Sequence, residues 1–322
     1  MSDFRSQTLS LPDQLRWAGR LTVPDIARPG SVLVAGMGGS GISGDFAAVS
    51  CEAEGVRLEV VKGYRLPAWV EEERPLVVAV SYSGNTEETL AVVEQASTLG
   101  LEVVGISSGG ALADSDLAHH IEVPGGNQPR ASLGYLLGSL QRVLVAASIL
   151  PDDGLAEAAA VTAEIYESFD AGPLVEAVAN RIVVVWGGSD LTAPVAQRWK
   201  TQINENAKAP AWWSVLPEAD HNEIVSFEAL ASLTSSSVVV VPLRDREDHP
   251  RVDRRFQHTR ALTQRGVAWA DEVWSRGDGL LARMLSLTAI ADLVSLGLAE
   301  RYGVDPESVA LIDELKQLLK ES

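Results

Sequence analysis

The run SVLVAGMG, residues Ser31–Gly38, decides the fold of this chain. It begins with apolar and β-branched residues and ends in glycines, which is typical of a buried strand that turns tightly where it stops. Strands without polar residues on either face are common in parallel sheets, because helices cover both faces of such sheets. The fold therefore depends on whether strands and helices alternate in the flanking sequence.

Strand and helix patterns do alternate through the N-terminal half. The predicted strands are Ser31–Gly38, Leu58–Tyr64, Leu76–Ser83, Glu102–Ser107 and His120–Pro124, and the predicted helices are Asn85–Leu99 and Ala131–Leu150. This alternation indicates an α/β fold with a parallel sheet covered on both faces.

The pattern restarts after a turn-rich break at Pro151–Gly154. The predicted strands of this half are Arg181–Gly188, Pro210–Leu216, Ser236–Leu243 and Val267–Trp274, and the predicted helices are Leu155–Val178, Leu191–Asn206, Pro250–Gln264, Leu280–Tyr302 and Pro306–Lys320. A strand followed by Gly-Gly-Ser occurs in both halves, at residues 38–40 and 187–189. We therefore expect two similar α/β domains, residues 1–152 and 153–322.

The chain of 322 residues is strongly acidic. It has 26 Lys and Arg against 44 Asp and Glu, which gives a formal net charge of −18. Nucleic acids and membrane surfaces are polyanionic, so neither is an expected partner. An anionic ligand must be held by local groups, against the field of the whole protein.

Three further features bear on the compartment. Cys51 is the single cysteine, which excludes an internal disulfide and a cysteine-based zinc site and suits a reducing cytosol. No apolar run approaches the roughly 20 residues of a membrane span. The polar segment Met1–Arg20 is unlike a signal peptide. We therefore expect a cytoplasmic protein.

The first motif, GMGGSG, covers Gly36–Gly41 at the end of the first strand. Its small residues let the backbone approach a ligand, and amides at a following helix N-terminus attract anions. The motif also matches the dinucleotide fingerprint GxGxxG, which needs an acid at the end of the second strand. That strand ends in Val60–Tyr64, VVKGY, without an acid. A glycine turn, a nucleotide site and a site for a small anion or sugar all remain open.

The second motif, SYSGNTEET, covers Ser81–Thr89, where a buried strand meets a helix. Hydroxyls and backbone amides there can hold a phosphate monoester without Lys or Arg, aided by the helix dipole. The alternative is a capping box formed by Ser83, Thr86 and Glu87. One cap needs one hydroxyl, whereas this motif has four Ser and Thr hydroxyls, so phosphate binding is favoured.

Four charged residues elsewhere could take part in catalysis. Glu205 lies between two asparagines late in a predicted helix, and His221 lies in a polar loop; both residue types transfer protons. Arg130 precedes a long apolar helix and could stabilise an anion. Lys316 lies in the C-terminal helix. On chemistry alone, each of the four is also an ordinary structural or surface residue.

Six motifs in order resemble those of the bifunctional phosphoglucose/phosphomannose isomerases of the sugar isomerase (SIS) superfamily. They are GMGGSGISGD (36–45), SYSGNTEET (81–89), PRASLGY (129–135), RWKTQINENAK (198–208), PEADHNEI (217–224) and IDELK (312–316). SYSGNTEET alone indicates only a SIS domain, whereas NENAK together with HNEI is more specific to this group. The resemblance spans nearly the whole chain.

The resemblance implies two SIS domains, each a five-stranded parallel sheet flanked by helices in a flavodoxin-like three-layer sandwich. It implies a homodimer with active sites at the subunit interface. It also implies reversible isomerisation of glucose 6-phosphate or mannose 6-phosphate to fructose 6-phosphate. No metal and no organic cofactor are expected.

The resemblance further implies a role for each candidate residue. The substrate phosphate would be bound by Gly39, Ser40, Ser81, Ser83 and Thr86. Glu205 would move the proton between C1 and C2 through a cis-enediol intermediate, and Arg130 would stabilise the enediolate charge. His221 of the partner subunit would open the sugar ring, with Lys316 as a helper.

Three alternatives remain at this point. A catalytically silent SIS protein that senses a sugar phosphate would keep the hydroxyl motif but could lose Glu205, His221 and Lys316, all of which are present here. A SIS isomerase for another phosphosugar, such as an amino sugar, would keep the same motifs. A nucleotide-dependent oxidoreductase is disfavoured by the missing acid after the second strand.

Overall fold

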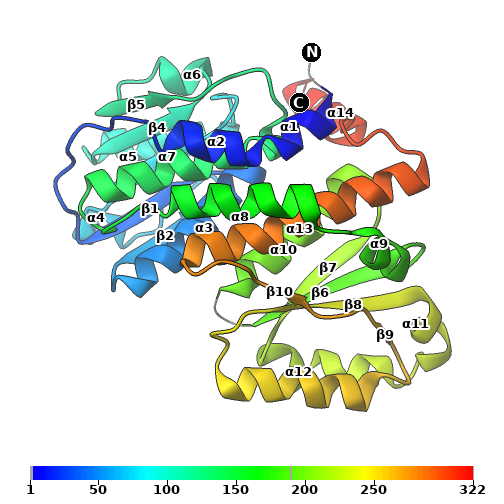
Figure 1. Cartoon of the computed structure of the whole chain (residues 1–322). Coiled ribbons are helices and arrows are strands. Elements are labelled where there is room, and N and C mark those ends of the chain that lie inside the picture. The colour runs from blue at the N-terminus through cyan, green and yellow to red at the C-terminus, as the bar shows by residue number, and fades with distance from the viewer. Residues whose placement is uncertain (1–2, 189–190, 322) are drawn as a thin grey trace. The chain divides into compact units, whose positions relative to one another are not determined.

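The computed structural model describes residues 3–188 and 191–321 (Figure 1). Contacts divide the chain into two compact units: unit 1 is residues 1–168 with 275–287, and unit 2 is residues 169–274 with 288–322. The domain boundary that the sequence predicts, between residues 152 and 153, stays a prediction. Ser189, the last residue of the second Gly-Gly-Ser, lies outside the described residues.

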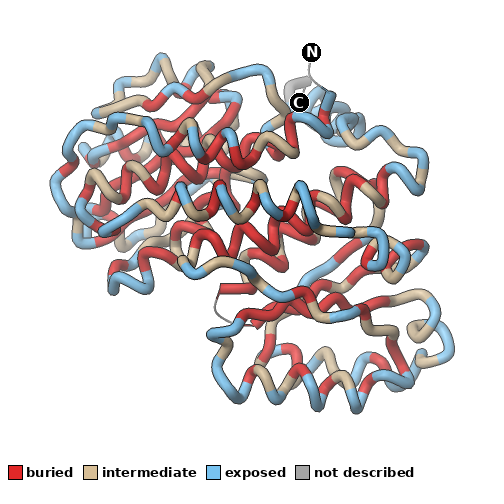
Figure 2. Tube along the Cα trace, in the orientation of Figure 1, coloured by how far each residue is buried: buried red, intermediate tan, exposed pale blue. Residues whose placement is uncertain are grey.

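Unit 1 is built on a parallel five-stranded sheet, as the alternating pattern predicts. Its strands are β1 (Ser31–Ala35), β2 (Arg57–Val61), β3 (Leu76–Val80), β4 (Val103–Ser107) and β5 (His119–Glu122). Their order is β2-β1-β3-β4-β5, and all neighbours run parallel. Every residue of β1, β3 and β4 is buried, as the red strands of Figure 2 show. The order is that of a flavodoxin-like sheet.

This strand order determines where a ligand can bind in unit 1. The chain passes from β1 to β2 on one side of β1, and then places β3 on the other side. In doubly wound sheets, ligands bind at the carboxyl ends of the strands where the order reverses. That point lies between β1 and β3, and the two loops that leave the sheet there are the glycine motif and the hydroxyl motif.

Helices surround the sheet of unit 1. They are α1 (Phe4–Leu9), α2 (Leu11–Ala18), α3 (Gly38–Ala53), α4 (Val70–Glu73), α5 (Glu87–Thr98), α6 (Gly110–Ala113), the 3-10 helix η1 (Pro129–Ala131), α7 (Leu133–Ala146) and α8 (Leu155–Ser168). The sequence did not predict α1 and α2, because they have only six and eight residues and their buried faces include polar residues such as Gln7 and Gln14. The long helix predicted from Ala131 is η1 followed by the shorter α7.

Unit 2 contains a second parallel sheet. Its strands are β6 (Ile182–Gly188), β7 (Ala211–Leu216), β8 (Val238–Arg244), β9 (Ala268–Trp269) and β10 (Val273–Trp274), in the order β10-β8-β6-β7 with β9 also pairing with β8. Its helices are α9 (Gly172–Val178), α10 (Thr192–Ala207), η2 (Glu218–His221), η3 (Glu223–Phe227), α11 (Ala231–Ser237), α12 (Pro250–Thr263) and α14 (Ala310–Glu321). Helix α13 (Leu280–Tyr302) contributes its first residues to unit 1 and the rest to unit 2.

Three predicted elements of the second half differ in the structure. The single helix Leu155–Val178 is interrupted before Gly172 and forms α8 and α9, because the Asp170 carboxylate accepts the Gly172 amide and a proline follows. The strand Val267–Trp274 is two short pairings, β9 and β10. The last helix begins at Ala310 instead of Pro306, because the preceding residues form a local turn.

Helix α13 corrects the expectation that no segment could span a membrane. By length and composition alone, this helix is long and apolar enough to cross a bilayer. However, 83% of its most apolar window is buried within the structure, as in the core helix of a globular protein.

The single cysteine, Cys51, is fully buried, and burial raises the pKa of its thiol to about 12.

Candidate active site

The glycine motif brings the loops after β1 and β3 into close contact. A Cβ added at Gly36 would lie 2.9 Å from the Val80 carbonyl oxygen, so β1 and β3 leave no room there for a side chain. Gly38 begins α3 with a positive φ of 51°. The motif therefore ends a buried strand and opens a 16-residue helix within two residues, which fits its prediction as a close-approach loop.

The hydroxyl motif forms a turn closed by its own side chains. The Ser81 and Thr86 hydroxyls are 2.8 Å apart and bond each other. Ser83 is exposed, and its Oγ accepts the Asn85 amide at 3.3 Å. Thr86 is the N-cap residue of α5 but makes no side-chain cap bond. The capping-box alternative is therefore wrong for this hydroxyl, which belongs to a cluster at the helix N-terminus.

Ser40 and Gly39 connect this cluster to two other loops. The Tyr82 amide donates to Ser40 Oγ at 3.3 Å, which joins the loops after β1 and β3. A Cβ added at Gly39 would lie 3.4 Å from the Arg130 Cα. The structure thus brings together, within unit 1, all of the predicted phosphate-binding residues and the backbone of η1.

Arg130 itself is buried, with 6% of its surface exposed, and its guanidinium lies 4.4 Å from the centre of the Phe4 ring. The N-terminal helices hold this region. Gln7 Oε1 accepts the Gln128 amide at 2.8 Å, and the fully buried Gln14 donates to the Ala131 carbonyl at 2.7 Å. Nothing in the sequence patterns pointed to these supports, because they come from residues about 120 positions away.

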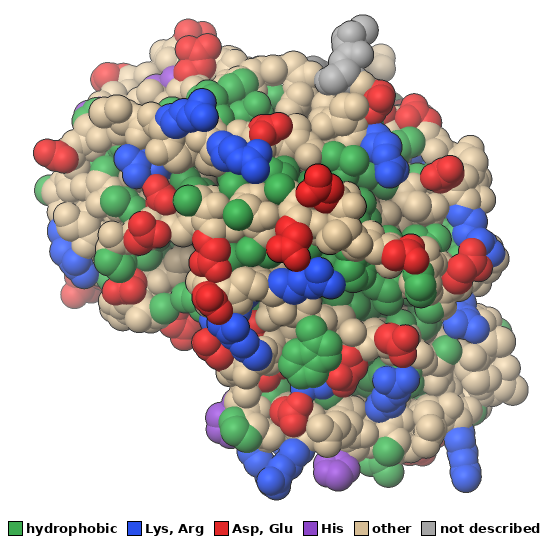
Figure 3. Space-filling view, in the orientation of Figure 1, with side chains coloured by type: hydrophobic (Ala, Val, Ile, Leu, Met, Phe, Trp, Pro, Cys, Tyr) green, Lys and Arg blue, Asp and Glu red, His purple; other side chains and the backbone are tan. Residues whose placement is uncertain are grey.

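An ion pair lies beside the glycine motif. Lys62 follows β2 and pairs with Asp45 of α3, and the Lys62 Cε would lie 3.1 Å from a Cβ added at Gly41. Burial raises the pKa of Asp45, and the bond and charge of Lys62 oppose that shift. On the face drawn in Figure 3, acidic and basic side chains are interspersed. The net charge of −18 is therefore not gathered into one patch on that face.

In unit 2, Glu205 lies in the last turn of α10 and is partly buried. Its neighbours fix this turn: Asn204 donates to the Ala209 carbonyl at 2.9 Å, and Asn206 donates to Ser295 Oγ at 3.0 Å. The Lys208 ammonium donates to the Glu205 carbonyl at 2.5 Å. The NENAK motif is thus a structured helix end in which the flanking amides bond away from Glu205.

His221 lies in the loop after β7 and is exposed. Carboxylates on either side anchor this loop. Asp220 accepts from Arg255 at 2.9 Å and from Thr259 at 2.7 Å, and Glu223 accepts from the Trp186 indole at 3.0 Å. No role is predicted for these two acids from the sequence, although their places on either side of the histidine are a visible signal.

Glu205 and His221 lie beyond opposite ends of strand β7 in unit 2. Helix α10 leads into the start of β7, and Asn204 reaches the residues just before that strand. His221 follows the other end of β7. The six residues of β7 are separated by five steps of about 3.3 Å, so the two ends of the strand lie roughly 17 Å apart. The structure therefore does not bring these two predicted catalytic residues together within one unit.

Lys316 lies in α14, all of whose described side chains are exposed. The segment before this helix passes close to the end of α10, since the Lys208 ammonium lies 3.4 Å from the Pro306 carbonyl. The structure thus places the approach to α14 near the NENAK turn. The predicted role of Lys316 stays a prediction.

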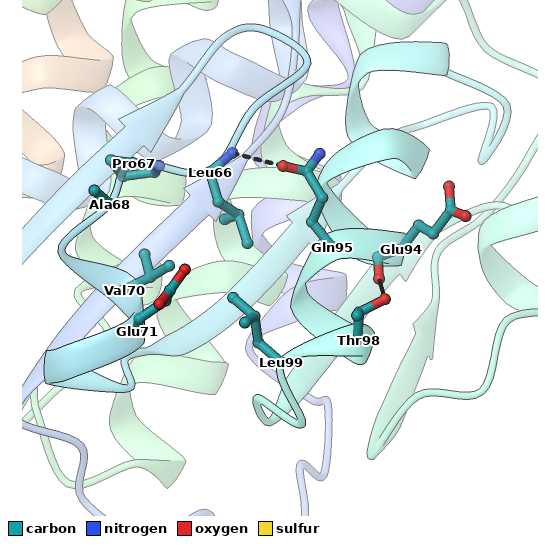
Figure 4. Close-up of a pocket in the computed structure, with 9 residues that line it drawn as sticks. All are labelled: Leu66, Pro67, Ala68, Val70, Glu71, Glu94, Gln95, Thr98 and Leu99. Atoms are coloured by element: carbon teal, nitrogen blue, oxygen red, sulfur yellow. Dashed lines mark hydrogen bonds between the residues drawn. The ribbon is translucent and has the colours of Figure 1, made fainter.

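A separate hollow of about 350 Å³ lies in unit 1 beside α5, and Figure 4 shows its lining. Its lining residues include Glu71 and Glu94, and the Leu66 amide donates to Gln95 at 3.2 Å. None of the predicted site residues lines it. Two carboxylates without a lining cation disfavour a phosphate there. In the described part of the chain, no three His, Cys, Asp or Glu side chains gather as metal ligands.

Similarity to known proteins agrees with the motifs. The family model for the bacterial phospho-glucose isomerase C-terminal SIS domain matches residues 167–319. The bifunctional phosphoglucose/phosphomannose isomerase of Caldicellulosiruptor bescii is 37% identical, over 90% of this chain and 89% of that protein. The chain belongs to this family. The resemblance inferred from the six motifs is therefore confirmed.

Two other similarities show how broad the fold is. The D-glucosamine-6-phosphate 4-epimerase of Sulfolobus acidocaldarius is 30% identical, over 92% of this chain and 91% of that protein. The C-terminal domain of glucosamine-fructose-6-phosphate aminotransferase from Francisella tularensis is 14% identical, with a TM-score of 0.74 over 96% and 98% of the two chains. The second likeness concerns the fold alone.

Proposed function

We propose that this family member is an aldose–ketose isomerase that interconverts glucose 6-phosphate and mannose 6-phosphate with fructose 6-phosphate. The observation that carries the proposal is the hydroxyl cluster at the strand-order reversal of unit 1, where Ser81 and Thr86 lie 2.8 Å apart at the N-terminus of α5. Hydroxyls and amides at such a point suit a phosphate monoester in an acidic protein.

The proposed chemistry is proton transfer between two adjacent carbons. Glu205 takes the proton from C2 of the open-chain aldose while the C1 oxygen gains a proton, which gives the cis-enediol. Returning the carbon-bound proton to C1 while the C2 hydroxyl loses its proton gives the ketose. A carboxylate suits both steps, because the same group acts as base and then as acid. Arg130 stabilises the negative charge that develops on the enediolate oxygen.

Ring opening is proposed for His221 of the partner subunit, with Lys316 as helper. The separation of Glu205 and His221 by the length of β7 supports this assignment, because a single copy presents them beyond opposite ends of that strand. A homodimer whose active sites combine residues of both copies would bring Glu205 of one copy to His221 of the other. Two SIS domains and a cytoplasmic location complete the proposal.

The first test measures turnover by the purified protein. Fructose 6-phosphate formation is followed separately from glucose 6-phosphate and mannose 6-phosphate, and we expect turnover of both. Glu205→Gln should abolish turnover, by about 10³-fold or more, because the amide cannot accept the proton. Phosphosugar binding measured by calorimetry should be retained.

Glu300→Gln is the matched control, since Glu300 is an exposed helical glutamate of the same unit. It should leave turnover unchanged. Glucosamine 6-phosphate is the competing substrate, given the epimerase relative. Activity on the amino sugar without activity on glucose 6-phosphate would replace this proposal, and binding without any turnover would favour a sugar-phosphate sensor.

A further inference from the structure

Tyr82 lies inside the hydroxyl motif, but its own hydroxyl bonds elsewhere. It is 5% exposed, so its ring is packed inside unit 1. The phenol donates to the Pro124 carbonyl at 2.9 Å and accepts the Asn127 amide at 3.0 Å. Both partners belong to the segment between β5 and η1.

The Tyr82 backbone joins two more loops. Its amide donates to Ser40 Oγ in the first turn of α3. Its carbonyl accepts the Ser108 amide at 2.9 Å and the Ser108 hydroxyl at 2.7 Å. One residue therefore connects the loops that follow β1, β4 and β5 to the loop after β3.

The segment that the phenol holds leads directly to Arg130. After Asn127, the next amide, that of Gln128, donates to Gln7, and η1 follows. The Tyr82 hydroxyl thus fixes the start of this segment, and Gln7 fixes its end. A movement of the segment would move the Arg130 backbone relative to the hydroxyl motif.

We propose that Tyr82 is a positioning residue that holds the Arg130 segment against the phosphate-binding loop. This inference rests on the proposed function and adds to it a coupling between Tyr82 and Arg130. Phosphate binding at Ser81 and Thr86 fixes one end of the sugar, and the Tyr82 bonds fix the distance from that end to Arg130. Arg130 then meets the charge that develops only in the transition state.

The test is Tyr82→Phe, which removes one oxygen atom and keeps the ring. Small misplacements of a group that stabilises the transition state lower kcat more than they weaken substrate binding. We expect kcat for glucose 6-phosphate to fall about tenfold. KM and the inhibition constant of inorganic phosphate should stay within about twofold.

Tyr302→Phe is the matched control. The Tyr302 hydroxyl accepts the Asn180 amide at 2.8 Å, which is the same kind of bond in unit 2. This variant loses a comparable hydrogen bond far from the Arg130 segment in sequence, and its kcat should match the wild type. An equal loss of kcat in both variants would mean a general loss of structure and would overturn the inference.

A double-mutant cycle with Arg130→Ala tests the route. If Tyr82 acts through Arg130, adding Tyr82→Phe to Arg130→Ala should lower kcat no further. A full tenfold additional loss would overturn the inference. So would unchanged kcat in Tyr82→Phe alone.

Amide hydrogen exchange separates this inference from the proposed function. Exchange over residues 124–131 should accelerate in Tyr82→Phe, whichever phosphosugar the protein takes, while residues 87–98 should keep their wild-type rates. Unchanged exchange over 124–131 would overturn the inference. Failure of the wild-type protein to isomerise either hexose phosphate would instead reject the proposed function.

Discussion

Thr86 is the N-cap residue of α5, but its hydroxyl bonds Ser81 instead of capping the helix. Each hydroxyl has one proton to donate and lone pairs to accept, so the hydroxyl that accepts within this pair still has its own proton to donate to a phosphate. Ser81 is almost fully buried and Ser83 is exposed, so the cluster extends from the interior of unit 1 to its surface. Such side chains are arranged before a ligand arrives.

Replacing Thr86 by valine tests this arrangement, because the substitution exchanges one hydroxyl for a methyl group. Hydrogen bonds to charged groups contribute about 1.5–3 kcal/mol, so KM for glucose 6-phosphate should rise about 10- to 100-fold in Thr86→Val. The control is Thr98→Val in the same helix, where the hydroxyl bonds the Glu94 carbonyl at an exposed site. Steady-state kinetics should show an unchanged KM for that control. An equal KM in Thr86→Val and the wild type would place phosphate binding elsewhere.

The site residues differ in how far the sequence could predict them. Hydroxyls collected in one short motif make Ser81, Ser83 and Thr86 candidates, because their spacing is local. The contacts of Tyr82 and Gln14 could not be predicted, because each depends on partners brought close only by the folded chain. Long-range hydrogen bonds leave no local pattern in a sequence.

Gly84 shows how the turn after β3 is built. Its φ is +69°, and a Cβ there would lie 1.7 Å from the Gly109 carbonyl oxygen in the loop after β4. The two loops are in contact at this point, so both the backbone conformation and the space require glycine. Gly84 therefore allows the tight connection between β3 and α5.

Gly84→Ala should destabilise unit 1 strongly. Gly55 offers a control with nearly the same φ, +70°, and no atom within 4 Å of an added Cβ. Gly55→Ala should cost about 1–2 kcal/mol for the left-handed conformation alone. Gly84→Ala adds a backbone clash and should exceed about 3 kcal/mol in urea unfolding. Equal losses in the two variants would contradict the contact between the loops.

Among the elements, long and regular patterns were predicted well. The central strands of the first sheet follow from short continuous apolar runs, and helix α13 follows from a long one. The short helices α1 and α2 and the pairings β9 and β10 were missed or merged, because two to eight residues carry too little pattern. Their structure is set by packing against neighbouring elements.

For the whole molecule, the positions of the two proposed proton-transfer groups constrain how one active site can be assembled. Glu205 and His221 lie beyond opposite ends of β7, and no side chain spans that distance. Both can act on one sugar if each comes from a different copy. Sedimentation of the purified protein should then show a homodimer.

Mixing two inactive variants tests this sharing of residues. In a heterodimer of Glu205→Gln and His221→Ala, one site carries both substitutions and the other carries neither. Random exchange of subunits should therefore restore about a quarter of the wild-type activity. In the control, Glu205→Gln is mixed with the double variant Glu205→Gln/His221→Ala. No site then has Glu205, so no activity should be restored. If tagged heterodimers form but stay inactive, a single copy supplies both groups, and the shared site is rejected even where Glu205 remains the base.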